Sequence, residues 1–356
     1  MVGKIIDDDI KAIAEQLKPD AGRLSGKTLL ITGGSGFIGR YLVLTIDFLN
    51  KTFLEEPCNV IVLDNFITGI KNSNLDNANV KIVNHNVINP LKVEDNVDII
   101  IHAAGIASPF YYSKFPLETI DVGTIGTRNM LDLAKEKEVE SFAFVSSSEV
   151  YGDPEPVPTP ETYLGNVNCI GPRACYDESK RLGETLCMVY HQLFKVPVKV
   201  IRPFNVYGPG IKWDDFRVLP NFIYNALKGN DLPVYGKGDH TRSFCYITDA
   251  VVEIYKVLLS DCNGEVFNIG NQNDEISVMD LAKIVAGVFD NKIGIKKIDG
   301  SAVYASSNPK RRCPDLNKLR RLIRYEPEID LKTGLLRTIQ WFKEEYSIPI
   351  KETVSA

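Results

Sequence analysis

Two short segments carry side chains that could move protons and hydride. Tyr176 and Lys180 stand four residues apart in a stretch whose pattern predicts a helix, so their side chains share one helix face. A phenol with a reference pKa of about 10 is a weak base, and a neighbouring ammonium lowers that pKa by favouring the phenolate. Upstream, Ser147 and Glu149 add a hydroxyl and a carboxylate. This set is typical of an enzyme that takes up and returns hydride while it acts on a sugar.

A Tyr-Lys pair at this spacing also occurs on exposed amphipathic helices, and a glycine-rich turn near the start of the chain decides between the two interpretations. An apolar run at residues 27–32 predicts a buried strand, glycines follow it, and a helical pattern begins after them. Glycines in this context allow a tight turn and a close approach of the backbone to a diphosphate, while the helix N-terminus offers free N–H groups. The residues expected to bind the cofactor here are Gly33, Gly36, Phe37, Ile38 and Gly39.

The second apolar strand, at residues 60–63, ends in Asp64 and Asn65, where a dinucleotide-binding unit needs a contact to a ribose. A carboxylate accepts hydrogen bonds from the ribose 2′-hydroxyl and repels a 2′-phosphate. The sequence therefore predicts NAD rather than NADP as the cofactor.

Composition limits the other function classes. The chain has 356 residues and a net charge of −5, with no basic block, so nucleic acid is not an expected partner. No apolar stretch approaches the roughly 20 residues that span a bilayer. The acidic N-terminus does not resemble a signal peptide. The seven cysteines show no C-x-x-C spacing, so no metal site is expected, and a reducing cytoplasm fits best.

The order of elements predicts an α/β fold. Residues 1–26 contain a short amphipathic helix, interpreted as a structural extension. Strands alternate with helices over residues 27–203, which favours a Rossmann-type doubly wound parallel sheet. A return segment is expected at about 240–260, and residues 204–350 otherwise form a smaller substrate-binding lobe that ends in a helix.

The chain resembles the extended short-chain dehydrogenase/reductases, which include nucleotide-sugar epimerases, dehydratases and decarboxylases, and within them the UDP-glucuronate decarboxylases. The match extends over about residues 27–345. It is carried by residues 32–39, 64–66, 107–109, 148–154, 165–168 and 171–178, and later by 204–205, 207–209 and 241–244.

The resemblance implies roles for residues at matching positions. Tyr176 and Lys180 resemble the redox pair, Ser147 the contact to the sugar O4, and Glu149 the acidic group near C5. Arg242 resembles the arginine that grips the diphosphate, and Arg312 one at the sugar end, because a guanidinium suits both phosphate and carboxylate. Further implied contacts are Ala103 and Gly105 to the cofactor, and Ser108, Pro109, Tyr112, Ser148, Arg173, Asn205, Arg217 and Tyr235 to the substrate.

Ser148 distinguishes among the chemistries of these enzymes. In the similar 4,6-dehydratases an aspartate stands at the position of Ser148, and it protonates the departing C6 hydroxyl. A serine is too weak an acid for that step. Decarboxylation needs no such acid, because a C4 ketone turns a glucuronosyl group into a β-keto acid. A nucleotide-sugar 4-epimerase remains the alternative. A 4,6-dehydratase and a catalytically inactive NAD-binding protein fit less well.

Some positions depart from the family pattern. Glu118 and Gly210 stand where the decarboxylases carry a lysine and an arginine, and Gly123 stands where an asparagine is common. His102 and Cys175 are expected to be packing residues. The family's usual dimer implies contacts through helices at 124–137 and 176–193.

Overall fold

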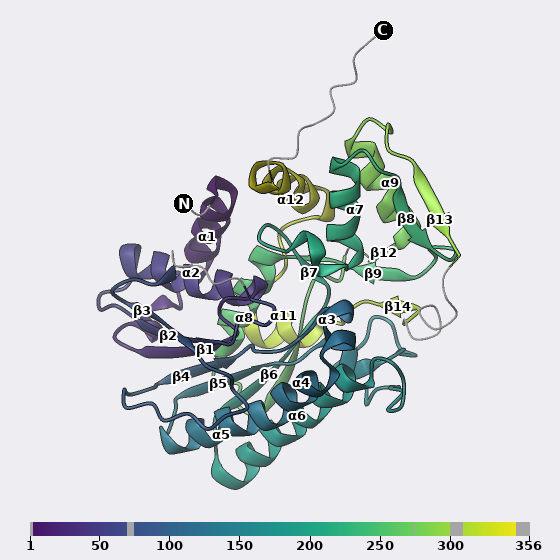
Figure 1. Ribbon diagram of the computed structural model, residues 1–356. Helices are drawn as coiled ribbons and strands as arrows, with labels where there is room; N and C mark the ends of the chain where they lie inside the picture. Colours follow the sequence, from purple (N-terminus) through teal and green to yellow (C-terminus); the bar gives the residue numbers. More distant parts are fainter. Residues whose placement is uncertain (1–2, 70–74, 274, 300–308, 347–356) are drawn as a thin grey trace.

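A parallel sheet of seven strands forms the centre of the molecule (Figure 1), in a computed structural model that describes residues 3–69, 75–273, 275–299 and 309–346. The strand order is β11-β6-β5-β4-β1-β2-β3, and every neighbouring pair runs parallel. The strands are β1 (Thr28–Thr32), β2 (Asn59–Asp64), β3 (Val80–Asn84), β4 (Ile99–His102), β5 (Ser141–Val145), β6 (Val198–Pro203) and β11 (Glu265–Ile269). The predicted Rossmann-type fold is confirmed.

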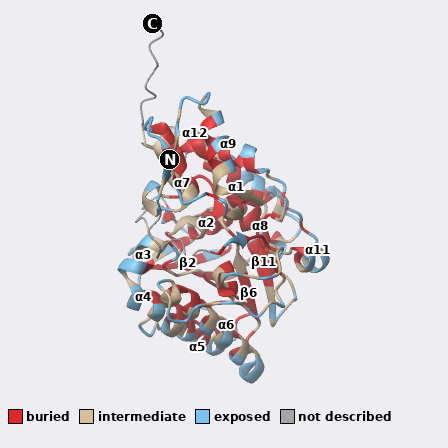
Figure 2. Cartoon of the chain, turned by 90° about the vertical axis from the view of Figure 1, so that its right-hand side faces the viewer, coloured by how far each residue is buried: buried red, intermediate tan, exposed pale blue. Residues whose placement is uncertain are grey.

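Alternate side chains of each strand enter two apolar cores, one on each face of the sheet. On β1, Leu29 and Ile31 join the core under α2 (Phe37–Thr52) and α8 (Ile247–Leu258), whereas Leu30 joins the core under α5 (Thr127–Glu136) and α6 (Ala174–Phe194). Figure 2 shows buried strands between helices whose outer faces are exposed. Both faces are therefore covered, as the near-continuous apolar runs require.

The boundaries differ from the sequence-based expectations in two places. The seventh strand, β11, lies beyond the return segment expected at about 240–260, so the chain comes back to the sheet over a longer stretch. The helix expected at 124–137 begins as a π-helical turn, η3 (Val122–Gly126), after the short helix α4 (Pro116–Asp121). A Cβ atom at Gly123 would lie 2.7 Å from Ser179 Oγ, so the close packing of η3 on α6 explains the glycine at this position.

The smaller lobe lies beyond the carboxyl ends of the strands (Figure 1). It contains the paired strands β8 and β13, the sheet β12-β9-β14, and the short pair β7 and β10. The strands are β7 (Val206–Tyr207), β8 (Leu232–Tyr235), β9 (Thr241–Ser243), β10 (Cys245–Tyr246), β12 (Glu275–Ser277), β13 (Ile295–Ile298) and β14 (Arg311–Arg312). The helices are α7 (Val218–Leu227), α9 (Val278–Val288) and α12 (Leu331–Tyr346), whereas α11 (Asn317–Ile323) packs on β11 of the central sheet. The pairing of β14 with β9 places Arg312 beside Arg242.

The N-terminal helix α1 (Lys4–Leu17) packs on the body of the protein beside α2 and α8, with its apolar face buried. Asp9 lies on this buried face and is fully enclosed. Its carboxylate accepts hydrogen bonds from the hydroxyls of Tyr41 (3.1 Å) and Tyr246 (2.9 Å) and pairs with Arg337 of α12. Burial outweighs these partners and raises the pKa of Asp9 to about 6. One carboxylate thus joins the N-terminal extension to α2, to β10 and to the C-terminal helix α12.

Replacing Asp9 with alanine should lower the free energy of unfolding by roughly 2–3 kcal/mol, because it leaves two buried hydroxyls and a guanidinium without their acceptor. Urea unfolding followed by circular dichroism measures the loss. Asp8→Ala, at an exposed position of the same helix, is the matched control and should change little. Equal stability of the two variants would contradict this role of Asp9.

Candidate active site

A cavity of about 1170 Å³ opens at the carboxyl ends of the parallel strands and extends to the smaller lobe. This is the position at which open α/β sheets bind ligands, and its volume exceeds that of a single small-molecule site. The expected residues that line it are Gly33, Gly36, Phe37, Ile38, Gly39, Asp64, Asn65, Ala103, Gly105, Ser108, Pro109, Tyr112, Ser147, Ser148, Glu149, Arg173, Tyr176, Lys180, Asn205, Arg217, Tyr235 and Arg242.

The glycine turn between β1 and α2 forms one end of the cavity. Gly33 has a φ of +71°, and a Cβ atom there would lie 2.9 Å from the backbone of Ala104. At Gly39 a Cβ atom would lie 2.1 Å from the carbonyl oxygen of Gly33. Only glycine fits at these two positions, and the exposed start of α2 is left open to a diphosphate.

Asp64 closes the same end of the cavity. Its carboxylate accepts backbone hydrogen bonds from Ser35 (3.0 Å) and Phe66 (2.8 Å), which fix it at the end of β2. The carboxylate therefore faces the cavity in a defined position beside the glycine turn. This cradle fits an adenine dinucleotide with a free 2′-hydroxyl.

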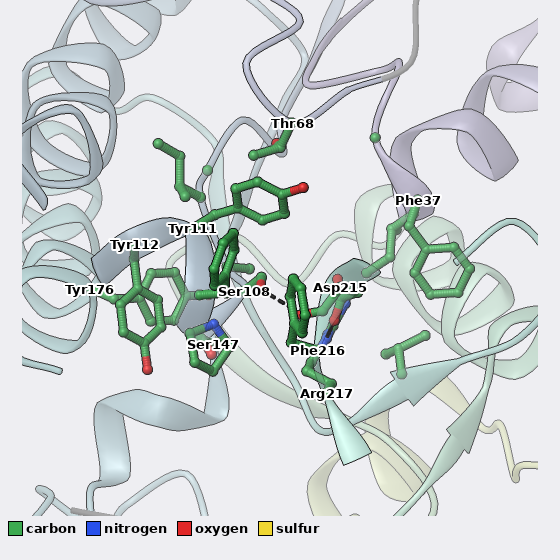
Figure 3. A pocket seen from close by; sticks show the side chains of 18 of the residues that line it. Phe37, Thr68, Ser108, Tyr111, Tyr112, Ser147, Tyr176, Asp215, Phe216 and Arg217 are labelled. Atoms are coloured by element: carbon green, nitrogen blue, oxygen red, sulfur yellow. Dashed lines mark hydrogen bonds and ion pairs between the residues drawn. The ribbon is translucent and has the colours of Figure 1, made fainter. Parts of the chain in front are cut away.

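Tyr176 and Lys180 enter the cavity from the first turns of α6. Figure 3 shows Tyr176 beside Tyr112 and close to Ser147, and the two tyrosine rings stack with centroids 5.5 Å apart. Burial raises the pKa of Tyr176 to about 12, although its hydrogen bond with Ser147 acts in the opposite direction. Lys180 donates to the carbonyl oxygen of Val145 (2.8 Å), and burial lowers its pKa to about 8.

The expectation that Lys180 lowers the pKa of Tyr176 is therefore wrong for this structure. The ammonium is directed at Val145, 6.0 Å from the centre of the phenol ring, and is itself destabilised by burial. Desolvation of the phenol is the larger effect.

Glu149 is held between two arginines at the sugar end. It lies in η4 (Ser148–Tyr151), where Ser147 Oγ accepts a hydrogen bond from its backbone N–H (3.2 Å), and its carboxylate pairs with both Arg173 and Arg312. Burial alone would raise the pKa of Glu149, but the two guanidinium groups outweigh it and lower the pKa to about 2. The two guanidinium groups therefore favour the ionised form of Glu149.

Arg312 lies deeper than the resemblance implies. It is almost fully buried, donates to Gly152 O (2.9 Å) and Ser148 Oγ (3.4 Å), and is not one of the described residues that line the cavity. Its guanidinium contacts Glu149 rather than the open space. Arg242 does line the cavity, and burial together with the nearby Arg312 lowers its pKa to about 10. Three guanidinium groups around one carboxylate make this end a site for an anion.

A strap at residues 212–217 crosses the cavity, and sequence reasoning did not find it. Ser108 Oγ donates to the carbonyl oxygen of Asp215 (2.6 Å), Lys212 Nζ donates to Thr68 O (2.6 Å), and the rings of Phe110 and Phe216 lie 4.5 Å apart. Figure 3 shows Asp215 and Phe216 facing Ser108 across the space. The only signal in the sequence is two large apolar side chains, Trp213 and Phe216, in a loop.

The strap changes the surroundings of several expected substrate contacts. The Ser108 hydroxyl is engaged by the strap, and Arg217 pairs with Asp215 within it. Asn205 donates to Ser243 O (2.9 Å), and Tyr235 lies at the exposed rim. These side chains surround the cavity, but in this structure the hydroxyl, guanidinium and amide are held by the protein itself.

His102 and Cys175 have the surroundings of packing residues. His102 is buried between the hydroxyls of Thr32 (2.7 Å) and Thr127 (3.2 Å), and burial lowers its pKa to about 3. The lowered pKa favours the neutral ring, and His102 is not among the described residues that line the cavity. Burial also raises the pKa of the Cys175 thiol.

Over the described ranges, no three His, Cys, Asp or Glu side chains gather in a way that would hold a metal ion. The same part of the chain contains no helix that is both long and apolar enough to cross a membrane. All seven cysteines are free.

Two relatives with curated names are similar over most of the chain. A UDP-glucuronic acid decarboxylase of Xenopus tropicalis is 40% identical over 322 residues, which cover 90% of this chain and 73% of that protein. Another, of Arabidopsis thaliana, is 40% identical over 314 residues, which cover 87% of this chain and 88% of that protein.

Solved structures show the same architecture. The epimerase Mth375 of Methanothermobacter thermautotrophicus superimposes with a TM-score of 0.79 at 27% identity, covering 96% of this chain and 98% of that one. The dTDP-glucose 4,6-dehydratase DesIV of Streptomyces venezuelae, solved with NAD bound, gives a TM-score of 0.78 at 25% identity, covering 90% and 98%. The model of one family, described as "NAD dependent epimerase/dehydratase family", matches residues 29–270. Because this match extends over nearly the whole seven-stranded sheet and the cofactor end of the cavity, the chain is an NAD-dependent enzyme that belongs to the NAD-dependent epimerase/dehydratase family.

Proposed function

We propose that the protein decarboxylates UDP-glucuronate through a 4-keto intermediate, giving UDP-xylose or the 4-keto pentose. The relatives at 40% identity are named UDP-glucuronic acid decarboxylases, and the expected catalytic side chains surround one cavity. The observation that carries the proposal is the state of Ser148 and Glu149. One is a serine that receives a hydrogen bond from Arg312, and the other is a carboxylate whose ionised form is favoured by two paired arginines.

Neither of these side chains can protonate a leaving hydroxyl group. A general acid needs a pKa near the working pH, and the pKa of Glu149 is about 2. Loss of water from C6 therefore lacks its catalyst, whereas loss of carbon dioxide does not need one. This comparison favours decarboxylation over 4,6-dehydration.

The first step is oxidation at C4. NAD supplies the hydride acceptor for this step. Tyr176, hydrogen-bonded to Ser147, must be ionised to take the proton of the C4 hydroxyl, although burial raises its pKa. Lys180 on the same face of α6 and the positive charge that bound NAD would bring lower the free-energy cost of that phenolate. The product is a ketone at C4, one carbon from C5.

The second step is loss of the C6 carboxylate. The C5–C6 bond breaks, carbon dioxide leaves, and the electron pair moves into the C4 carbonyl as an enolate, which then takes a proton from water at C5. Because Arg173 and Arg312 are paired with Glu149, they are less available to stabilise the C6 carboxylate. Repulsion by Glu149 is relieved as neutral carbon dioxide forms, and this lowers the barrier. Returning the hydride to C4 completes the cycle.

A nucleotide-sugar 4-epimerase is the second candidate. It would use the same Tyr176 and Lys180 cycle. Glu118 and Gly210 stand where the resemblance implies a lysine and an arginine, and the absence of these two charges counts against the decarboxylase. Incubation with a panel of nucleotide sugars and NAD, followed by mass spectrometry, separates the candidates. Loss of carbon dioxide from UDP-glucuronate supports the proposal, no change of mass supports the epimerase, and loss of water indicates a dehydratase.

We also propose a homodimer, located in the cytoplasm. Exposed apolar side chains gather on α4, η3 and α6, and they are Leu117, Ile120, Ile125, Leu182, Val189, Leu193 and Phe194. A patch of this kind suits an isologous contact. The exposed large apolar side chains precede α5 rather than lying on it, so the dimer helices expected at 124–137 begin earlier in this proposal. Seven free cysteines suit a reducing compartment.

The protein should bind NAD at least tenfold more tightly than NADP, a difference of about 1.4 kcal/mol, because the Asp64 carboxylate repels a 2′-phosphate. Titration calorimetry with both dinucleotides measures the preference. Asp64→Asn keeps the size of the side chain and the acceptor oxygen of one of its two backbone hydrogen bonds but removes the charge, so the preference should shrink. Equal affinities in the unchanged protein would refute this role.

Glu149→Gln should slow the release of carbon dioxide about 100-fold, whereas the rate of oxidation at C4 should stay within about tenfold of the unchanged protein. The reason is that the neutral amide frees Arg173 and Arg312 to hold the C6 carboxylate. Absorbance of NADH follows the first step, and mass spectrometry follows the second. Tyr176→Phe is the control, because it should stop both steps. If Glu149→Gln slows both steps equally, Glu149 has no separate part in decarboxylation.

Light scattering at micromolar concentration should give the mass of a dimer, and Leu193→Glu should shift it toward the monomer by placing a charge in the apolar patch. Leu336→Glu, at an exposed apolar position on α12, is the matched control and should leave the dimer intact. A monomeric unchanged protein would rule out the dimer.

A further inference from the structure

We propose that Arg40 binds the diphosphate of NAD. Gly210 stands where the resemblance implies an arginine, and Arg40 would supply the positive charge that this glycine lacks. The proposal depends on NAD being the cofactor and not on the choice of sugar substrate. It assigns a function to a side chain for which the sequence-based interpretation had none.

Arg40 lies in the first turn of α2, next to the glycine turn. Its backbone N–H donates to the carbonyl oxygen of Gly36 (3.0 Å), the N-cap residue of this helix. Side chains of a helix lean toward its N-terminus, which places the side chain of Arg40 over the turn that precedes its own Cα. Arg40 lines the main cavity together with Phe37, which Figure 3 shows at the edge opposite Tyr176.

The guanidinium of Arg40 has no anionic partner among the residues that the structure describes. Its Nε atom is buried without a hydrogen-bond partner, and no hydrogen bond or ion pair joins the side chain to another residue that the structure describes. Burial lowers the pKa of Arg40, and the exposed Glu345 of α12 compensates only in part. A positive charge at the start of a helix also opposes the helix dipole. An unpaired, half-buried cation in this place is unfavourable unless a ligand brings negative charge.

The NAD diphosphate brings that charge to the same place. Its two negative charges are expected at the N-terminus of α2, where the glycine turn leaves the backbone open. The nearby cations that line this cavity are already engaged, since Lys212 donates to Thr68 O and Lys180 to Val145 O. Arg40 is the arginine beside the turn that remains available.

The neighbouring residues explain why the cation is at position 40. Gly210 has a φ of +90°, which strains any residue with a side chain, so an arginine does not fit there. Ile6 of α1, Phe37 and Tyr41 face Gly210 at 3.7–4.0 Å from where its Cβ would lie, and Arg40 borders the same small hollow. The N-terminal helix thus closes the far side of Arg40, and the cavity is its open side.

The test is titration calorimetry on the full-length protein after bound nucleotide has been removed. Arg40→Met keeps the length of the side chain and removes the charge, and Arg40→Lys restores a charge. The ligands are NAD, ADP-ribose and adenosine, of which only adenosine lacks the diphosphate. Arg321→Met, at an exposed position on α11 away from the cavity, is the matched control.

Arg40→Met should weaken binding of NAD and of ADP-ribose by about tenfold or more, which is the usual effect of losing one charge-assisted hydrogen bond, and should leave adenosine binding unchanged. Arg40→Lys should recover part of the loss. Affinity for NAD should also depend less on salt concentration in Arg40→Met than in the unchanged protein.

Unchanged NAD affinity in Arg40→Met, or an equal loss for adenosine, would overturn the proposal and leave Arg40 as a support for α12. If the unchanged protein itself does not bind NAD, the cofactor assignment fails as well. The melting temperature of the ligand-free variants checks their folding. If Arg40→Met does not fold, Arg40→Gln carries the same comparison, because it also lacks the charge.

Discussion

The ion pairs that Glu149 forms with Arg173 and Arg312 are the interaction on which the sugar end of the site depends. The three side chains come from η4, the residue before α6, and β14. Each charge is largely removed from water, so each is stable only while the others stay in place. This end of the cavity therefore depends on the pairing of β14 with β9 in the smaller lobe, which positions Arg312. Arg242, beside them, lines the cavity and offers its positive charge to an anionic group there.

The same ion pairs restrict the chemistry. An ionised Glu149 cannot act as an acid, and Ser148 is a hydroxyl beside a guanidinium. A site with no proton donor at this place suits a substrate whose leaving group departs without one. A β-keto acid meets this requirement because its electrons move into a neighbouring carbonyl.

Local sequence patterns were sufficient for the sheet and for most of the cavity lining. β1 and β2 are apolar runs followed by a glycine turn and by Asp64, and parallel strands bring these ends to one edge. The depth of Arg312 could not be predicted in this way, because it follows from the pairing of β14 with β9, two strands far apart in the chain. The strap at 212–217 depends on contacts with Ser108 and Thr68, which no local pattern encodes.

The protonation of Tyr176 was also beyond the sequence. The spacing to Lys180 is correct, but a pKa depends on burial and on the direction in which the ammonium points, and both follow from tertiary packing. The structure instead makes Ser147 the central polar contact of the tyrosine. The same hydroxyl accepts a hydrogen bond from the backbone of Glu149, so it connects the residue proposed to act at C4 with the residue proposed to lie near C5. Oxidation and loss of the carboxylate can then take place in succession on a sugar that does not have to move between the two steps.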